Sequence, residues 1–201
     1  MKFIPLIICN NIENYMNSNN LNKSNGKKNN AIIFGGSGFI GSHLINYLAD
    51  ELNMNCINLD IRQTNKRNEG SVYEYCDVRE SIKIKSKVNK NDIIFNLSAI
   101  HTTPGHSKEE YYTTNVLGAK NVCEFATNNM INKIVFFSSI SVYGTTEKKM
   151  NEDSILMPDT YYGMSKLIAE TINISWYKKQ DLNRKLIILR PGIVFGKGEN
   201  G

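Results

Sequence analysis

The sequence of 201 residues predicts an α/β fold in which helices cover both faces of a parallel β-sheet. Two observations support this prediction. From residue 30 onwards, short apolar runs of strand length alternate with longer stretches that carry apolar residues at helical spacing. The apolar runs are also continuous, which is typical of strands that are buried on both faces. Strands and helices that alternate in this way form a doubly wound sheet, here of about six or seven strands.

The expected elements follow one another in a regular order. Strands are expected at residues 31–35, 56–61, 72–76, 92–100, 133–139 and 185–190. Helices are expected at residues 41–53, 109–130 and 161–179, where apolar residues recur at intervals of three and four.

The first 29 residues differ in composition from the rest of the chain. Ten of the first 30 residues are Asn, and the apolar run at 3–9 is too short to cross a membrane. Polar Asn10 and Asn11 follow that run, where a cleavage site would need small residues. We expect residues 1–29 to form a disordered tail and residues 30–201 to form one folded domain. A targeting segment is the alternative interpretation of the tail.

Composition argues against several classes of function. Hydrophobic residues make up 41% of the chain and charged residues 21%, as in ordinary soluble proteins. The net charge of +5 comes from scattered lysines and forms no basic stripe, so we expect neither a nucleic acid nor a membrane as partner. The cysteines show no metal-binding spacing, and we expect no metal. We expect them to be reduced core residues of a cytoplasmic protein. They are Cys9, Cys56, Cys76 and Cys123.

A glycine-rich segment, GGSGFIG at residues 35–41, ends the first expected strand and opens the first expected helix. Gly35 would permit a tight turn, Gly38 would let the backbone approach a pyrophosphate, and Gly41 would allow close packing of helix on strand. The amino end of the helix offers unpaired N–H groups and the positive end of its dipole to phosphates. This Rossmann-type arrangement predicts a dinucleotide site.

An acidic residue stands at the end of the second expected strand. Asp60 lies where a carboxylate accepts hydrogen bonds from the hydroxyl groups of an adenosine ribose. The same charge repels a 2′-phosphate, so the sequence favours NAD over NADP as cofactor. Arg62 carries the opposite charge nearby, and an ordinary turn residue is the alternative interpretation of Asp60.

A second group of polar residues follows the fifth expected strand. Tyr162 and Lys166 are four residues apart in the helix expected at 161–179, which places them on one helix face. The carboxyl end of the preceding strand carries Ser138, Ser139 and Ser141, and such ends are where a doubly wound sheet binds its ligand. A Y-x-x-x-K pair alone recurs by chance, so a buried Tyr beside a surface Lys is the alternative.

These residue types suit the oxidation of an alcohol. A Tyr phenol titrates at about 10, too high for a general base at neutral pH. A neighbouring ammonium group and the positive nicotinamide ring would lower that pKa. A Ser hydroxyl can hold the substrate oxygen while Tyr162 removes its proton and a hydride leaves the same carbon.

With these motifs in this order, the chain resembles the extended short-chain dehydrogenase/reductase family. Within that family it is similar to the NAD-dependent epimerase/dehydratase type, which includes UDP-galactose 4-epimerase. The resemblance covers residues 31–200. It also rests on DV at 77–78, NLSA at 96–99, NVLG at 115–118, SSISVYG at 138–144 and LRPG at 189–192.

The resemblance implies how NAD would be held. Phe39 and Ile40 would contact the pyrophosphate through their backbones, and Asp77 and Val78 would flank the adenine. The nicotinamide ribose would meet Lys166. Further cofactor contacts would come from Leu97, Ser98, Ala99, Asn115, Tyr162 and Gly192.

The resemblance also implies a nucleotide sugar as substrate, with Ser139 as the catalytic hydroxyl, Tyr162 as the base and Lys166 as its partner. Ser141 would contact the substrate beside Ser139 and Tyr162. Dehydratases of this family place an Asp-Glu pair directly after the catalytic hydroxyl residue, whereas this chain has Ile140 and Ser141 there. We therefore expect C4 epimerisation. The alternatives are an NAD(P)-dependent reductase or dehydrogenase of the same family, and a catalytically weak cofactor-binding protein.

Relatives in this family continue beyond the sixth strand into a substrate domain, which is absent from these 201 residues. We expect the chain to be a cofactor-binding fragment that binds NAD and turns over a nucleotide sugar poorly. Relatives also pair two subunits through helices that correspond to 109–130 and 161–179, so a homodimer is expected.

Overall fold

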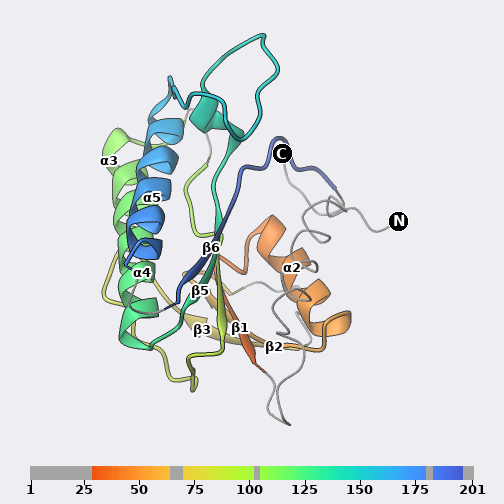
Figure 1. Ribbon diagram of the computed structural model, residues 1–201. Coiled ribbons are helices and arrows are strands. Elements are labelled where there is room, and N and C mark those ends of the chain that lie inside the picture. The colour runs from red at the N-terminus through yellow and green to blue at the C-terminus, as the bar shows by residue number, and fades with distance from the viewer. Residues whose placement is uncertain (1–28, 64–69, 102–104, 180–182, 197–201) are drawn as a thin grey trace.

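Six parallel strands form the centre of the part of the chain that the structure describes (Figure 1). This computed structural model describes residues 29–63, 70–101, 105–179 and 183–196. The sheet has the order β3-β2-β1-β4-β5-β6, and neighbouring strands pair in parallel. This is the Rossmann order, so the predicted fold class is confirmed. The strands are β1 (Asn30–Phe34), β2 (Asn55–Asp60), β3 (Ser71–Tyr75), β4 (Ile93–Asn96), β5 (Lys133–Phe137) and β6 (Lys185–Leu189).

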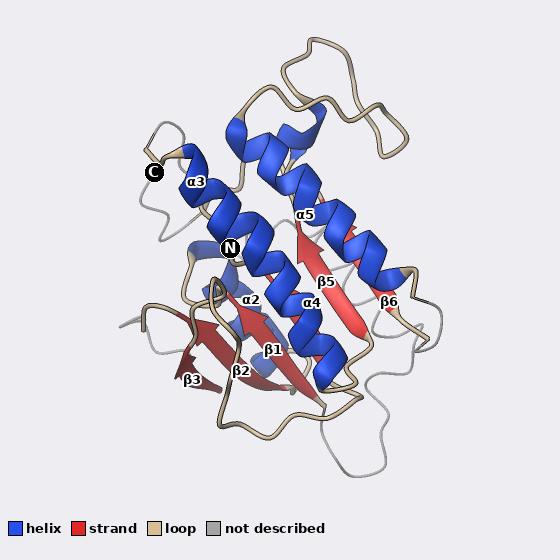
Figure 2. Cartoon of the chain, turned by 90° about the vertical axis from the view of Figure 1, so that its left-hand side faces the viewer, coloured by secondary structure: helices blue, strands red, loops and turns tan. Residues whose placement is uncertain are grey.

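Helices cover both faces of the sheet. Helix α2 lies against one face, and the longer helices α4 and α5 lie side by side on the other (Figures 1 and 2). The helical elements are α2 (Phe39–Asp50), α3 (Lys108–Tyr111), the π-helix η1 (Tyr112–Leu117), α4 (Gly118–Asn128), the 3-10 helix η2 (Ile140–Tyr143) and α5 (Tyr161–Tyr177).

The sheet separates two hydrophobic cores. Successive side chains of a strand point to opposite faces, so Ala31 and Ile33 enter one core while Ile32 and Phe34 enter the other. The first core is completed by α2 and the second by α4 and α5. From α2 come Leu44, Ile45 and Leu48; from α4 and α5 come Val122, Phe125, Ala126, Ala169 and Trp176.

The helix expected at 109–130 begins as predicted but is not uniform. Ser107 caps it with a capping box that Glu110 completes, and a π-helical stretch, η1, then separates α3 from α4. Within η1, Asn115 is buried and bonds to the backbone of Ile100 and to the hydroxyl of Ser165. Asn115 thus links η1 to the loop after β4 and to α5, and π-turns are frequent at functional positions.

The strand expected at 92–100 is shorter than predicted, because β4 ends at Asn96. The Asn96 side-chain oxygen accepts hydrogen bonds from both the backbone N–H and the hydroxyl of Ser98. Such a local side-chain turn competes with strand pairing. The apolar residues that follow belong to a loop beside the site.

Three of the expected core cysteines, Cys56, Cys76 and Cys123, are buried and free, as predicted. Burial raises the pKa of each thiol to about 12, which favours the unreactive protonated form. Cys9 and the tail predicted at 1–29 lie outside the described residues, apart from Asn29. Among the described helices, none has the length and apolar character needed to cross a membrane.

Candidate active site

The glycine-rich loop joins β1 to α2 and has little room for side chains. Gly35 has a φ of +78°, a conformation that L-residues with a Cβ rarely adopt. A Cβ on Gly41 would lie 2.5 Å from the carbonyl oxygen of Gly35. The loop therefore requires glycine at both of these positions.

The amino end of α2 opens from this loop. Gly38 is the N-cap, and no side chain caps the helix there. The first N–H groups of a helix have no partner within the helix, so those of Phe39, Ile40 and Gly41 form a donor group suited to a phosphate. The helix dipole adds a partial positive charge at the same end.

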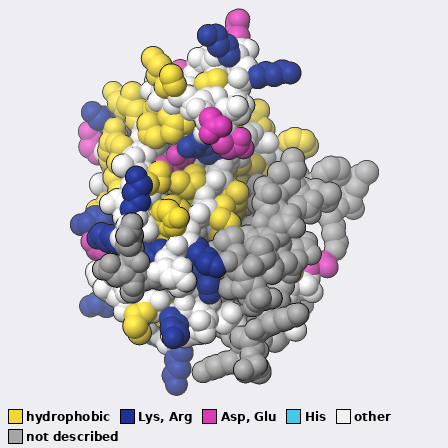
Figure 3. All heavy atoms as spheres, viewed as in Figure 1, with side chains coloured by type: hydrophobic (Ala, Val, Ile, Leu, Met, Phe, Trp, Pro, Cys, Tyr) yellow, Lys and Arg dark blue, Asp and Glu magenta, His cyan; other side chains and the backbone are white. Residues whose placement is uncertain are grey.

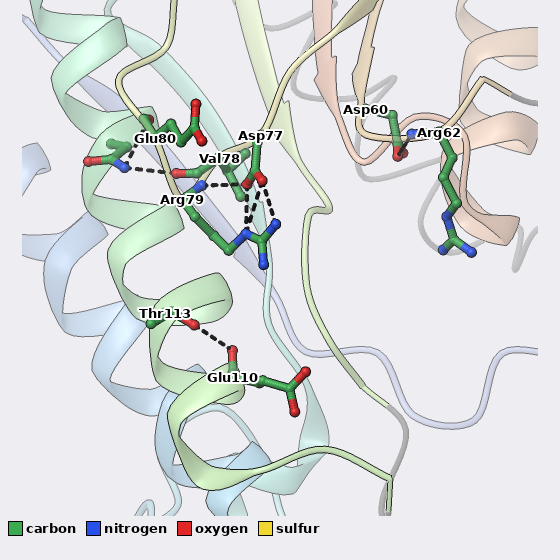
Figure 4. A network of polar contacts seen from close by, with 9 residues as sticks. Asp60, Arg62, Asp77, Val78, Arg79, Glu80, Glu110 and Thr113 are labelled. Atoms are coloured by element: carbon green, nitrogen blue, oxygen red, sulfur yellow. Dashed lines mark hydrogen bonds and ion pairs between the residues drawn. The ribbon is translucent and has the colours of Figure 1, made fainter.

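Asp60 ties this loop to the end of β2. One carboxylate oxygen accepts a hydrogen bond from the Ser37 N–H at 3.0 Å, and the other accepts one from the Arg62 N–H, also at 3.0 Å. The Arg62 side chain extends away from the carboxylate (Figure 4). Beneath the loop, buried Asn58 donates to the Ser37 hydroxyl at 3.1 Å. These contacts hold Asp60 and the glycine loop in one arrangement.

Asp77 and Val78 follow β3, in the segment predicted to flank the adenine. The Arg79 guanidinium hydrogen-bonds the Asp77 carboxylate and holds the pKa of that carboxyl below its usual range (Figure 4). Val78 is buried, and its carbonyl accepts a hydrogen bond from Asn121 of α4 at 2.8 Å. Asp77 is thus held ionised and Val78 fixed.

Leu97, Ser98 and Ala99 follow β4 and run beside the glycine loop. A Cβ on Gly35 would lie 2.8 Å from the Ser98 backbone nitrogen, so the two segments touch. The buried amide of Asn115 then fixes the end of this stretch at Ile100.

Ser139 and Tyr162 meet beyond the carboxyl end of β5. The Ser139 side chain caps η2 by accepting the Ser141 N–H, and its hydroxyl lies 3.1 Å from the Ser141 hydroxyl. Burial raises the pKa of the Tyr162 phenol; the Ser139 hydroxyl opposes this shift through a hydrogen bond, and nearby Tyr111 adds to it. The chain's own groups therefore favour the protonated phenol, and the lowering expected from a neighbouring nicotinamide ring stays a prediction.

Lys166 lies one turn further along α5, on the same helix face as Tyr162. It is 2% exposed, donates a hydrogen bond to the Phe137 carbonyl and lies over the Phe136 ring at 4.5 Å from its centroid. Burial lowers the pKa of Lys166 to about 7, against the opposing effect of Glu170. An amine that titrates near neutrality is a weak source of positive charge for a neighbouring phenol.

The structure brings the predicted residues to one edge of the sheet. Each predicted group lies at or beyond the carboxyl end of a different strand. The glycine loop follows β1, Asp60 ends β2, and the Asp77-Val78 segment follows β3. The loop at 97–99 follows β4, and the Ser139–Tyr162–Lys166 group lies beyond β5. Gly192 follows β6, where an added Cβ would lie 3.6 Å from Ile140.

Sequence reasoning missed two features of the site. Asn58, beneath the glycine loop, occupies a buried strand position and carried no motif. Glu170 and Arg190 form an ion pair behind Lys166, with side chains 1% and 19% exposed. The four-residue spacing from Lys166 to Glu170 was the available signal, but the partner Arg190 lies in another element.

Comparisons with known proteins give a consistent picture. The family described as "NAD dependent epimerase/dehydratase family" matches residues 31–201. An undecaprenol-linked N-acetylglucosamine 4-epimerase from Escherichia coli O157:H7 is 31% identical over 172 residues, which cover 86% of this chain and 51% of the relative. A dTDP-4-dehydro-6-deoxyglucose reductase from Escherichia coli is 31% identical over 190 residues, covering 86% of this chain and 58% of the relative.

A solved structure has the same fold. It is MoeE5 in complex with UDP-glucose and NAD, which is 27% identical with a TM-score of 0.68 and covers 80% of this chain and 53% of its own. The chain spans about half the length of the curated relatives it matches.

Because Lys166 is buried, we predict that the free energy of unfolding depends on pH. Its pKa of about 7 in the folded chain lies below the ordinary 10.5, so between these values the unfolded chain binds more protons. The free energy of unfolding must then rise with pH across that window. Chemical denaturation at about pH 7 and about pH 9 should show wild type gaining stability relative to Lys166→Met. A difference that is constant or shrinks would mean that Lys166 is charged when folded.

Proposed function

The chain belongs to the NAD-dependent epimerase/dehydratase family, and on that premise we propose that it is the NAD-binding part of a nucleotide-sugar 4-epimerase. One observation carries the proposal. The Ser139–Tyr162–Lys166 group and the glycine loop with Asp60 lie at the same edge of the sheet, although they come from widely separated parts of the sequence.

The residues present fit NAD, the cofactor on which this family depends. The uncapped end of α2 would receive the pyrophosphate, and the crowding that excludes side chains at Gly35 and Gly41 leaves backbone N–H groups in reach. Asp60 would accept hydrogen bonds from the adenosine ribose, and Asp77 and Val78 would flank the adenine. Lys166 would bind the nicotinamide ribose. Leu97, Ser98, Ala99, Asn115 and Gly192 would line the path between these ends.

Residues of the chain itself would bind the sugar C4 hydroxyl and transfer its proton. Ser139 holds the C4 oxygen of the sugar, with Ser141 beside it, and Tyr162 takes the C4 hydroxyl proton as the carbon is oxidised. When bound, NAD would supply the acceptor and donor of the hydride that leaves C4 and is restored on the opposite face of the sugar. Tyr162 would return its proton to the C4 oxygen, so that the product is the C4 epimer.

Tyr162 must lose its proton before it can act as a base. Burial raises its pKa, so deprotonation would depend mainly on the positive charge of the bound cofactor, because Lys166 is itself a weak source of positive charge near neutral pH. The Ser139 hydrogen bond also stabilises the phenolate.

A reductase or dehydrogenase is the second candidate. It would use the same three residues, and the similarity to a dTDP-4-dehydro-6-deoxyglucose reductase favours it. A dehydratase has less support, because η2 presents Ile140 and Ser141 where an acid pair would have to protonate and expel a hydroxyl group.

The cofactor assignment predicts a preference. By calorimetric titration the chain should bind NAD more tightly than NADP, because Asp60 repels a 2′-phosphate. Asp60→Asn should weaken NAD binding about tenfold, because a charged hydrogen-bond acceptor is lost. It should also reduce the difference between the affinities for NAD and NADP. Asp50→Asn, at an exposed position near the far end of α2, is the matched control and should change neither affinity. Equal or tighter NADP binding by the wild type would contradict the proposal.

The base assignment predicts an activity loss. A panel of nucleotide sugars is assayed with the 201-residue chain and with the complete translation product of its gene. Tyr162→Phe should lower kcat about a hundredfold or more, the usual contribution of a general base. Tyr161→Phe removes the same hydroxyl from the neighbouring, exposed tyrosine and should leave kcat unchanged. Activity that survives Tyr162→Phe would remove this residue from the base role.

We also propose that α4 and α5 pair with the same helices of a second copy. In the view of Figure 3, hydrophobic side chains gather around the upper part of α5 and in the centre of the face, and Lys and Arg side chains lie along the lower left. Tyr161, Met164, Ile168 and Tyr177 of α5 are exposed to solvent. Sedimentation at about micromolar concentration should show a dimer that Ile168→Glu dissociates, since an unpaired charge in an apolar interface is costly. A wild-type monomer would count against this pairing.

A further inference from the structure

A buried ion pair lies one helical turn beyond Lys166. Glu170 follows Lys166 by four residues on α5, so it shares the helix face that carries Tyr162. Both of its carboxylate oxygens accept hydrogen bonds from Arg190, at 2.9 Å from Nε and 2.8 Å from Nη2. Burying a carboxylate is costly, and this forked pairing offsets the cost.

Arg190 also reaches the segment that carries Ser139. Its Nη1 donates a hydrogen bond to the Tyr143 hydroxyl at 2.8 Å, and its guanidinium lies 5.1 Å from the centroid of the Tyr143 ring. Tyr143 is the last residue of η2, the short helix that Ser139 caps. Arg190 therefore joins the end of β6 to α5 and to η2.

We propose that Glu170 and Arg190 act together as positioning residues that set the charge of Lys166, and that Arg190 also fixes η2, and with it Ser139, against α5. The inference rests on the proposed function, in which Lys166 supports Tyr162.

The pKa of Lys166 depends on the charged groups that lie around it. Glu170 is the charged group that acts on the Lys166 amine, and Arg190 pairs with Glu170. Tyr162 on α5, Tyr143 on η2 and Tyr111 on α3 are titratable groups near the same site. The other charged side chains of α3 and α4 are exposed to solvent: Lys108, Glu109, Glu110, Lys120 and Glu124. Glu170 favours the ammonium form of Lys166, but Arg190 neutralises Glu170 at hydrogen-bond distance. The field that remains at Lys166 is that of a dipole, which is weaker than that of a full negative charge. Burial therefore prevails and lowers the pKa of Lys166 to about 7.

The two residues should have opposite effects when one is removed. Without Arg190, the uncompensated charge of Glu170 favours the ammonium form, so Lys166 titrates at higher pH. Without the Glu170 carboxylate, the nearby Arg190 charge disfavours the ammonium form, so Lys166 titrates at lower pH. If the pair served only packing, the two substitutions would not shift the pKa of Lys166 in opposite directions.

The test follows the Lys166 amine directly. In protein labelled with ¹³C-lysine, the Lys166 Cε signal is identified by its loss in Lys166→Met and is followed by NMR across neutral pH. We expect its midpoint to rise by about one pH unit in Arg190→Gln and to fall by about one unit in Glu170→Gln. The double variant Arg190→Gln/Glu170→Gln, in which both partners are neutral, should return the midpoint toward the wild-type value.

Two further variants separate the effect of charge on the Lys166 midpoint from the effect of the contact with η2. Arg190→Lys retains the positive charge and should restore most of the wild-type midpoint. Tyr143→Phe removes the contact to η2 but keeps the ion pair, so it should leave the midpoint unchanged. If a single variant does not fold, the neutral double variant and Arg190→Lys still test the proposal. Midpoints that do not move, or that move in the same direction in both single variants, would overturn it.

The measurement needs neither cofactor nor substrate. A failure of the proposed function would appear as absent NAD binding in calorimetry, while the Lys166 midpoints could still shift as expected. A failure of this inference would leave NAD binding intact and the midpoints unmoved.

Discussion

The parallel pairing of β1 with β2 on one side and β4 on the other is the constraint on which the site depends. In a parallel sheet all carboxyl ends meet at one edge, so Phe34, Asp60 and Asn96 end their strands within one region. The loops that follow these strands therefore start close together. The glycine loop then needs one further restraint, and the Asp60 carboxylate supplies it through the Ser37 N–H.

Most of the architecture could be predicted from the sequence because continuous apolar runs identify strands that are buried on both faces. The predicted strand ends agree with the structure to within two residues, except at β4. There the apolar character of Leu97 continued the pattern, while the Asn96 side chain ended the pairing. The π-turn at Asn115 was likewise not predictable, because its partners Ile100 and Ser165 come from other elements.

The candidate site shows the same division. The glycine loop, Asp60 and the Tyr162–Lys166 spacing are local patterns, and the sequence displays them directly. The pair of Glu170 and Arg190 joins residues that lie 20 positions apart on a helix and after a strand. Such a pair depends on how α5 packs against β6, which no local pattern specifies. The effect of burial on the Tyr162 pKa likewise depends on tertiary packing, which the local sequence does not display.

Burial is the common feature of three residues on the inner face of α5, which are Tyr162, Lys166 and Glu170. Within a low-dielectric core a charge is costly unless a partner offsets it, so the chain keeps Tyr162 protonated and weakens the ammonium form of Lys166. Glu170 is buried beside them with a forked partner, Arg190, bonded to both carboxylate oxygens. The face therefore combines a phenol whose pKa is raised by burial with an amine whose pKa is lowered to about 7 by burial. A positive charge brought near Tyr162 would act against the effect of burial on the phenol.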